Sequence, residues 1–235
     1  RAIVAGFDGW SFFFFFRDWA LMGKMAFSRI KGTEERITLL QKSSNHYFQR
    51  PDYEAVSLDT TQNYLNGWMG RFGFKKMRGQ FTAQTALGII SPGFNVNDLG
   101  YSRMTNVING HIVLGYRWVH PTKWYRKIYL NVMTSQNRDF DDNVLFRQVY
   151  GSLYYLLPNY YSVSASIQRS PEGLDNYLTR GGPIMGYPGY LASSLSVSTD
   201  QRKKVVVEGG YNSSEVDDGG YSRNANISFQ YKPES

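Results

Sequence analysis

Polar and apolar residues alternate with a period of two along most of the chain. In "YSVSASIQ", residues 161–168, the serines fall on one side and Tyr, Val, Ala and Ile on the other, because successive side chains of a strand point to opposite faces. The same alternation predicts eleven strands: Ala2–Phe16, Trp19–Arg29, Tyr64–Phe74, Gln80–Ile90, Thr105–Trp118, Trp124–Gln136, Val144–Leu156, Tyr160–Gln168, Tyr190–Thr199, Lys204–Tyr211 and Tyr221–Tyr231.

The predicted strands are long for a globular sheet. Several span ten to fourteen residues, whereas strands of globular proteins average about five or six and a transmembrane strand needs about nine to eleven. Helical spacing is confined to Thr33–Lys42, where we expect a short loop helix. No window of about 18 apolar residues exists, which excludes a membrane-spanning helix.

The predicted connections alternate between short and long. Tight turns are expected at Arg17–Asp18, Lys75–Gly79, His120–Lys123, Leu157–Asn159 and Asp200–Lys203. Long polar loops are expected at Ile30–Asn63, Ser91–Met104, Asn137–Asn143, Arg169–Gly189 and Asn212–Gly220. Outer-membrane barrels sort their connections in this way, with short periplasmic turns and longer external loops.

These patterns predict an all-β fold, an antiparallel up-and-down transmembrane β-barrel. Barrels of single bacterial chains close with an even number of strands. We therefore expect residues 1–235 to be a fragment of the barrel domain, with further strands before residue 1 and after residue 235. The alternative is a soluble sandwich, whose apolar faces would meet a core instead of lipid.

In a barrel, the polar side of each strand lines the lumen. The predicted lumen-lining residues are Asn109, His111, Arg117, Ser162, Ser164, Ser166, Asn224, Asn226 and Gln230. Aromatic residues gather near strand ends, as in "YRWVHPTKWY" and "LPNYY", where their rings would lie at the level of lipid headgroups. One strand, Val144–Leu156, breaks the pattern, because both of its faces are apolar and Arg147 falls on the lipid side.

Composition narrows the function further. The chain has no cysteine, which excludes disulfides, thiolate metal sites and cysteine nucleophiles. Its formal net charge is +7, but the Lys and Arg residues are scattered over turns, so a nucleic-acid partner is not expected. The partners expected are outer-membrane lipid and lipopolysaccharide, a polar or saccharide solute, and other envelope proteins.

Candidate catalytic and metal-binding residues are sparse. A protease at the external rim would use His46 with loop acids Asp139, Asp141, Asp175, Asp217 and Asp218, although solvated loop acids are the commoner explanation. "DFDDN" begins like a calcium loop at Asp139, Asp141 and Asn143, but Val144 replaces the glycine and Tyr150 the glutamate of that motif. We therefore expect that the protein binds no cofactor and has no enzymatic activity.

Several segments resemble a known family. "YFQRPD" at 47–52, "SPGFNVNDLGY" at 91–101, "LTRGGPIM" at 178–185 and "STDQRKKV" at 198–205 are similar to an uncharacterised bacterial family. In that family an amino-terminal, family-9-like carbohydrate-binding module precedes an outer-membrane β-barrel of unknown function. The resemblance implies architecture and no catalytic residues. The binding module has no counterpart in these residues, so sugar binding is not transferred to any position.

The leading functional hypothesis is a channel for a polar solute in the outer membrane of a Gram-negative-type bacterium, with selection by pore width and hydrogen-bonding lining. A plugged membrane anchor or assembly subunit, holding a periplasmic carbohydrate-binding module or an envelope complex, is the second. The rim protease is the third, and a soluble lectin-like domain is the least favoured.

Overall fold

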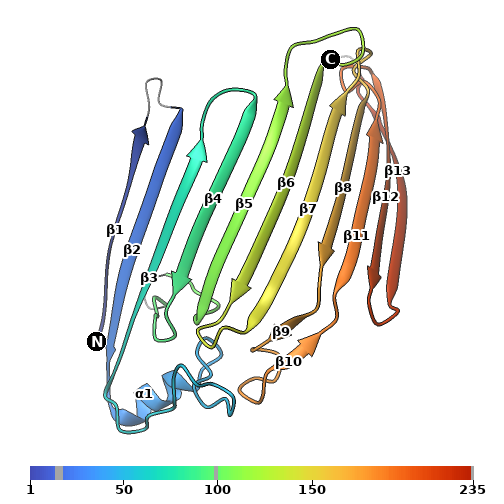
Figure 1. Cartoon of the computed structure of the whole chain (residues 1–235). Helices are drawn as coiled ribbons and strands as arrows, with labels where there is room; N and C mark the ends of the chain where they lie inside the picture. Colours follow the sequence, from blue (N-terminus) through green and yellow to red (C-terminus); the bar gives the residue numbers. More distant parts are fainter. Residues whose placement is uncertain (14–17, 98–99, 234–235) are drawn as a thin grey trace.

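The structure, a computed structural model, describes residues 1–13, 18–97 and 100–233. Its dominant feature is one antiparallel sheet of eleven strands in the order β1-β2-β3-β4-β5-β6-β7-β8-β11-β12-β13 (Figure 1). The strands are β1 (Ala2–Phe13), β2 (Trp19–Lys31), β3 (Tyr64–Lys76), β4 (Phe81–Ile90), β5 (Val107–Trp118), β6 (Lys127–Arg138), β7 (Val144–Leu156), β8 (Ser162–Ser170), β11 (Tyr190–Ser198), β12 (Val205–Val216) and β13 (Tyr221–Tyr231).

Each strand of the sheet pairs with the next one along the chain, which confirms the predicted antiparallel, up-and-down, all-β organisation. The single interruption is a small hairpin of β9 (Gly173–Asp175) and β10 (Met185–Tyr187) between β8 and β11, which the sequence did not predict. The sheet is open: within the described residues β1 pairs only with β2, and β13 only with β12.

Strand boundaries differ most from the prediction in the last third of the chain. The prediction of a long loop at Asn212–Gly220 is wrong, because β12 continues to Val216 and only a tight turn separates it from β13. Asn212, Ser213 and Ser214 have low strand propensity, yet their backbones pair on both sides, with β11 and with β13. The predicted long loop at Asn137–Asn143 is likewise a tight turn, because β6 continues to Arg138 and β7 begins at Val144. Residues 14–17, which include the end of the first predicted strand, lie outside the described residues.

Helix α1 (Glu34–Gln41) forms where the sequence predicts it. Thr33 is its N-cap, with Oγ1 accepting a hydrogen bond from the Arg36 backbone N–H. Ile37 of α1 is buried in an apolar cluster with Phe48, Tyr53 and Leu65, the last of which belongs to β3. The helix is thereby fixed against the end of the sheet (Figure 1). None of the helices in the described chain could span a membrane.

The sheet has two chemically distinct faces. Residues directly opposite each other on neighbouring strands share a face, so the strand register assigns each side chain. On one side, which we call the apolar face, the exposed large side chains are Ile3, Phe7, Phe13, Met25, Phe27, Tyr64, Trp68, Phe72, Phe81, Leu87, Ile112, Leu114, Leu130, Val132, Val149, Leu153, Ile167, Leu191, Leu195, Val197, Val205, Tyr211, Tyr221, Ile227, Phe229 and Tyr231.

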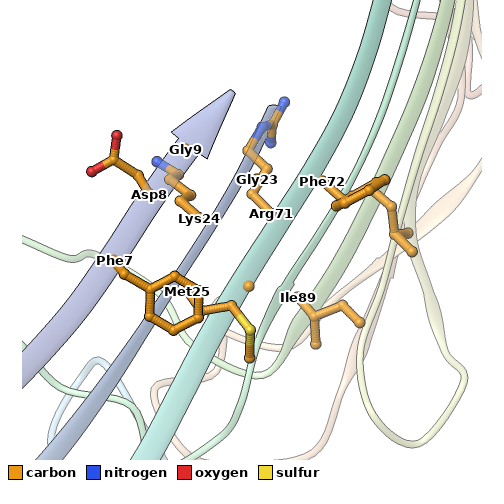
Figure 2. Close-up of a pocket in the computed structure, with 11 residues that line it drawn as sticks. Phe7, Asp8, Gly9, Gly23, Lys24, Met25, Arg71, Phe72 and Ile89 are labelled. Atoms are coloured by element: carbon orange, nitrogen blue, oxygen red, sulfur yellow. The ribbon is translucent and has the colours of Figure 1, made fainter. Parts of the chain in front are cut away.

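The opposite side, the polar face, has very few such groups. Of the exposed large hydrophobic residues in the described strands, only Trp10, Phe12 and Met22 lie on it. In the close-up of β1–β4, Asp8, Lys24 and Arg71 project away from Phe7 and Met25 (Figure 2). Within the described residues no second sheet packs on the apolar face, since the only other sheet is the β9–β10 hairpin.

Candidate functional site

The polar face brings the nine predicted lumen-lining residues to one side of the sheet. The register places Asn109 opposite Asn137 and Arg117 opposite Tyr129, and continues strand by strand to β13. All nine share this face: Asn109, His111, Arg117, Ser162, Ser164, Ser166, Asn224, Asn226 and Gln230. Whether they line a lumen stays a prediction, because the sheet is open.

The β7–β13 half of the polar face consists mainly of neutral hydroxyl and amide groups. Ser166 Oγ lies 2.8 Å from Ser194 Oγ across the β8–β11 pair. Gln168 Nε2 donates to Gln148 Oε1 and to the Tyr190 hydroxyl, each at 2.6 Å. These groups border a hollow of about 260 Å³ that Asn212 and Asn224 also line. This half can hydrogen-bond a polar molecule without adding charge.

Three connections pack together at one end of the sheet, which we call the loop end, and form a loop layer of residues 32–63, 91–97 with 100–106, and 171–189 (Figure 1). The second connection lies directly on the polar face, because the Asn95 N–H donates to Ser28 Oγ of β2 at 2.9 Å. A Cβ added at Gly67 of β3 would collide with the backbone of Phe94. Glycine at this position therefore permits the loop to touch the sheet.

His46 joins the first connection of the loop layer to the second. Its Nδ1 lies 2.8 Å from the Pro92 carbonyl oxygen and its Nε2 lies 3.1 Å from Asn95 Nδ2. These partners fit a neutral ring that donates through Nδ1–H and accepts at Nε2. Burial lowers the pKa of His46 below its usual value, by more than the bond to the Pro92 carbonyl raises it, and so keeps the ring neutral. His46 is therefore a structural residue of the loop layer.

Arg50 joins the first connection to the turn between β6 and β7. Its side chain is 3% exposed, its Nε donates to Asp52 Oδ1 at 3.2 Å, and its Nη2 lies 3.9 Å from Asp139 Oδ2. The guanidinium carbon also lies 4.8 Å from the centre of the Tyr53 ring. A buried cation with two carboxylates is costly to disrupt, so this group fixes the position of the loop layer.

Tyr177 attaches the third connection to the second. Its hydroxyl donates to the Thr105 carbonyl and accepts from the Thr105 N–H, both at 3.1 Å. Thr105 Oγ1 in turn donates to the Asn45 carbonyl at 2.7 Å, which adds the first connection. The glycines of "TRGGP" lie against the first connection: Gly181 has φ +100° and approaches Gln49. The loop layer is thus one hydrogen-bonded unit.

The residues of the weak calcium candidate, Asp139, Asp141 and Asn143, take part in hydrogen bonds within the protein. Asp139 Oδ1 accepts hydrogen bonds from the backbone N–H groups of Asp141 and Asn143. Asp141 Oδ1 accepts from the Ala55 N–H at 2.5 Å. These carboxylates accept hydrogen bonds from backbone N–H groups of the turn and of the loop layer. The bond from the Asp141 N–H to Asp139 is that of an Asx-turn.

The residues of the proposed rim protease are not brought together. His46 contacts a carbonyl and an amide through its ring nitrogens. Asp175 Oδ1 accepts from the backbone N–H groups of Tyr177 and Leu178. Asp217 forms a two-pronged ion pair with Arg169, with distances of 2.6 and 2.8 Å. A histidine–aspartate dyad, which general-base catalysis at this rim would require, is therefore not formed by these residues.

The apolar face contains a shallow groove where three glycines replace larger side chains. Gly9, Gly23 and Gly70 lie on adjacent strands, and Phe7 and Met25 stand beside them (Figure 2). The groove has a volume of about 460 Å³ and its other walls are Phe72, Leu87 and Ile89. Its apolar side chains favour contact with an apolar group over a polar one.

The sequence model of a family described as "Domain of unknown function (DUF5916)" matches residues 32–234, which contain the loop layer and all strands from β3 onward. None of the curated proteins matches the sequence. The matched description names neither an activity nor a ligand.

Proposed function

Since the chain belongs to the DUF5916 family, whose description gives no function, we propose from its own geometry that it forms part of a transmembrane β-barrel through which a polar solute crosses a Gram-negative outer membrane. The observation that carries the proposal is the segregation of side chains between the apolar face and the polar face over eleven strands. A bilayer outside and water inside require this segregation.

The exposed area of the apolar face is the strongest support. Soluble monomers rarely expose continuous apolar patches of more than a few hundred Å². Full burial of one Val, Leu, Ile or Phe side chain is worth roughly 1.5–3 kcal/mol, so leaving this face in water would be very unfavourable. A second sheet would be the solution of a soluble sandwich, and the described residues contain none for this face.

A closed barrel requires partners for both sheet edges. The outermost strands, β1 and β13, run in the same direction because ten reversals separate them in an eleven-strand antiparallel order. A barrel closed by antiparallel pairs alone has an even number of strands. An odd number of strands must therefore be added to these eleven. Lipid would leave the edge N–H and C=O groups unsatisfied, which makes closure part of the proposal.

Charged side chains on the apolar face are confined to strand ends and support an orientation. At the loop end, Arg138, Arg147 and Arg169 lie on three adjacent strands above the apolar surface. Arg138 and Arg169 are paired with Asp142 and Asp217, whereas Arg147 forms no ion pair within the described residues. Lipopolysaccharide phosphates would complement Arg147, so we place the loop end outside. At the other end, Trp19 stacks on Phe74 with ring centres 4.7 Å apart, as in an aromatic girdle.

The proposed mechanism is passive selection. The hydroxyl and amide groups of β8, β11, β12 and β13 replace part of the solute's hydration as it moves along the polar face. The loop layer narrows the external entrance, since its second connection lies on the polar face at Ser28 and Gly67. The same observation favours a second function, a plugged anchor that holds envelope partners at the membrane.

Conductance distinguishes the two functions. We expect the purified full-length protein to give stepwise currents in a planar lipid bilayer, because a continuous polar face provides a hydrated path. Membrane insertion without current above that of an empty bilayer would favour the plugged anchor. A full-length protein that stays monodisperse without detergent would contradict both membrane functions.

A further inference from the structure

We infer that the polar face holds a binding site for a carboxylated sugar, at a hollow over β1–β4. This inference rests on the proposed function and specifies its solute. The hollow has a volume of about 280 Å³, and the side chains that line it include Asp8, Trp10, Met22, Lys24, Arg71 and Gln84, that is, two cations against one carboxylate. Its volume is near the lower end of small-molecule sites, which begin at about 300 Å³.

Two cations face each other at this hollow. Lys24 of β2 and Arg71 of β3 are directly opposite in the register and both are exposed. Like charges directly opposite each other destabilise a sheet. Asp8 is directly opposite Lys24 on β1, yet within the described residues neither cation forms an ion pair. A bound anion would remove the repulsion, which indicates a carboxylate as the ligand group.

Arg71 is held in place and keeps most of its donors free. Its Nη1 donates to Asn109 Oδ1 at 3.4 Å, and Asn109 Nδ2 donates to Asn137 Oδ1 at 2.5 Å. Gly88 lies between Arg71 and Asn109 in the same row of the sheet, and a Cβ there would be 3.3 Å from Nη1. A guanidinium has five N–H donors in a planar fork that matches a carboxylate, so four remain for a ligand.

An exposed indole indicates that the anion carries a ring. Trp10 is 69% exposed and lies on the polar face together with Phe12 and Met22, and the centres of the Trp10 and Phe12 rings are 4.9 Å apart. An aromatic ring with one open side offers a flat apolar surface, and a pyranose ring has an apolar face that can stack on it. Gln84 also lines the hollow; its Nε2 lies 3.4 Å from His111 Nε2, and its carbonyl oxygen can accept from a hydroxyl. Carboxylate, ring and hydroxyls together describe a uronic acid.

The charges of the wider polar face agree with an anionic solute. Its basic strand residues are Lys24, Arg71, Lys75, Arg117 and Lys127, and its acidic ones within the described strands are Asp8 and Glu208. An excess of positive charge in a confined aqueous path raises the local concentration of anions. The site therefore lies where anions would accumulate.

Calorimetric titration of the full-length protein in detergent tests the site. We expect D-galacturonate to bind at least tenfold more tightly than D-galactose, which has the same ring without the carboxylate, and than acetate, which has the carboxylate without the ring. The double variant Lys24→Gln with Arg71→Gln should lose the preference for galacturonate. Arg29→Gln, on the apolar face of β2, is the matched control and should retain it.

Equal affinity for galacturonate and galactose, or a preference unchanged in the double variant, would overturn the inference. Acetate binding as tight as galacturonate would also overturn it, since the ring would then contribute nothing. The outcomes are separable from those of the proposed function. Current through the bilayer without galacturonate binding removes this site and leaves the channel, whereas binding without current removes the channel and leaves the site.

Discussion

Replacement of Ile112 by arginine is expected to destabilise the bilayer-inserted protein by about 2–4 kcal/mol, the loss typical of an arginine at the bilayer midplane on the lipid side of a barrel. Ile112 lies near the middle of β5 on the apolar face and is 49% exposed. A charged group there has only the hydroxyls of Thr85 and Thr134 beside it and no acidic partner on the neighbouring strands, so it must distort the lipid or leave it.

Val113→Arg is the matched control, because Val113 is the next residue of the same strand and faces Gln84 and Met133 on the polar face. An arginine there can be hydrated, so we expect a loss of less than about 1 kcal/mol, as for exposed substitutions of this kind. Denaturant titration of both variants in lipid vesicles gives the two losses. Equal losses, or a larger loss for Val113→Arg, would show that the faces are assigned wrongly.

Arg50→Ala is expected to release the loop layer, with a local loss of about 3–5 kcal/mol, the range measured when one partner of a buried ion pair is removed. The substitution leaves Asp139 and Asp52 without their cation and empties the space beside Tyr53. We expect faster amide hydrogen exchange in residues 91–97 and a larger single-channel conductance, because a loosened layer no longer narrows the entrance.

Arg36→Ala is the control for this prediction. Arg36 is exposed on α1, so its loss should change neither hydrogen exchange nor conductance. Exchange in β6 should stay unchanged in both variants, since the strands do not depend on Arg50. Arg50→Ala behaving like Arg36→Ala in both measurements would mean that the buried ion pairs do not hold the layer.

The alternation of the sequence was sufficient to predict the eleven strands of the sheet. A strand that separates two environments must alternate, and residues such as Ser162 to Ile167 carry this signal in their order alone. The signal fails where both sides are polar, as at Asn212–Glu215 of β12. It also fails for β9 and β10, whose three residues each are too few to show a period.

Contacts between distant segments could not be predicted in this way. His46 and Asn95 are 49 positions apart, and nothing in either segment indicates the other. The pairing of Lys24 with Arg71 depends on the register between β2 and β3, which a 32-residue connection separates. Gly67 carried a usable signal, because a glycine inside a strand often marks close approach of another backbone.

Arg147 shows how the structure resolves an ambiguity of the sequence. The pattern placed this residue on the lipid side, in a strand with two apolar faces. The register confirms the apolar side and adds that Arg147 is opposite Gln136, near the loop end of β7. In the proposed barrel, a long cationic side chain at that level would reach the headgroups while its methylene groups stay in lipid, so its position is compatible with the apolar face.

The central claim, that the apolar face contacts lipid, is tested most directly by spin labels along β6. Residues 1–235 contain no cysteine, so single cysteine substitutions at residues 130–135 can each be labelled in the full-length protein reconstituted in vesicles, with any cysteine outside these residues replaced by serine. The account predicts that labels at Leu130, Val132 and Thr134 are accessible to dissolved oxygen, and those at Asn131, Met133 and Ser135 to a water-soluble nickel chelate. Equal access of the nickel chelate to both sets would contradict it.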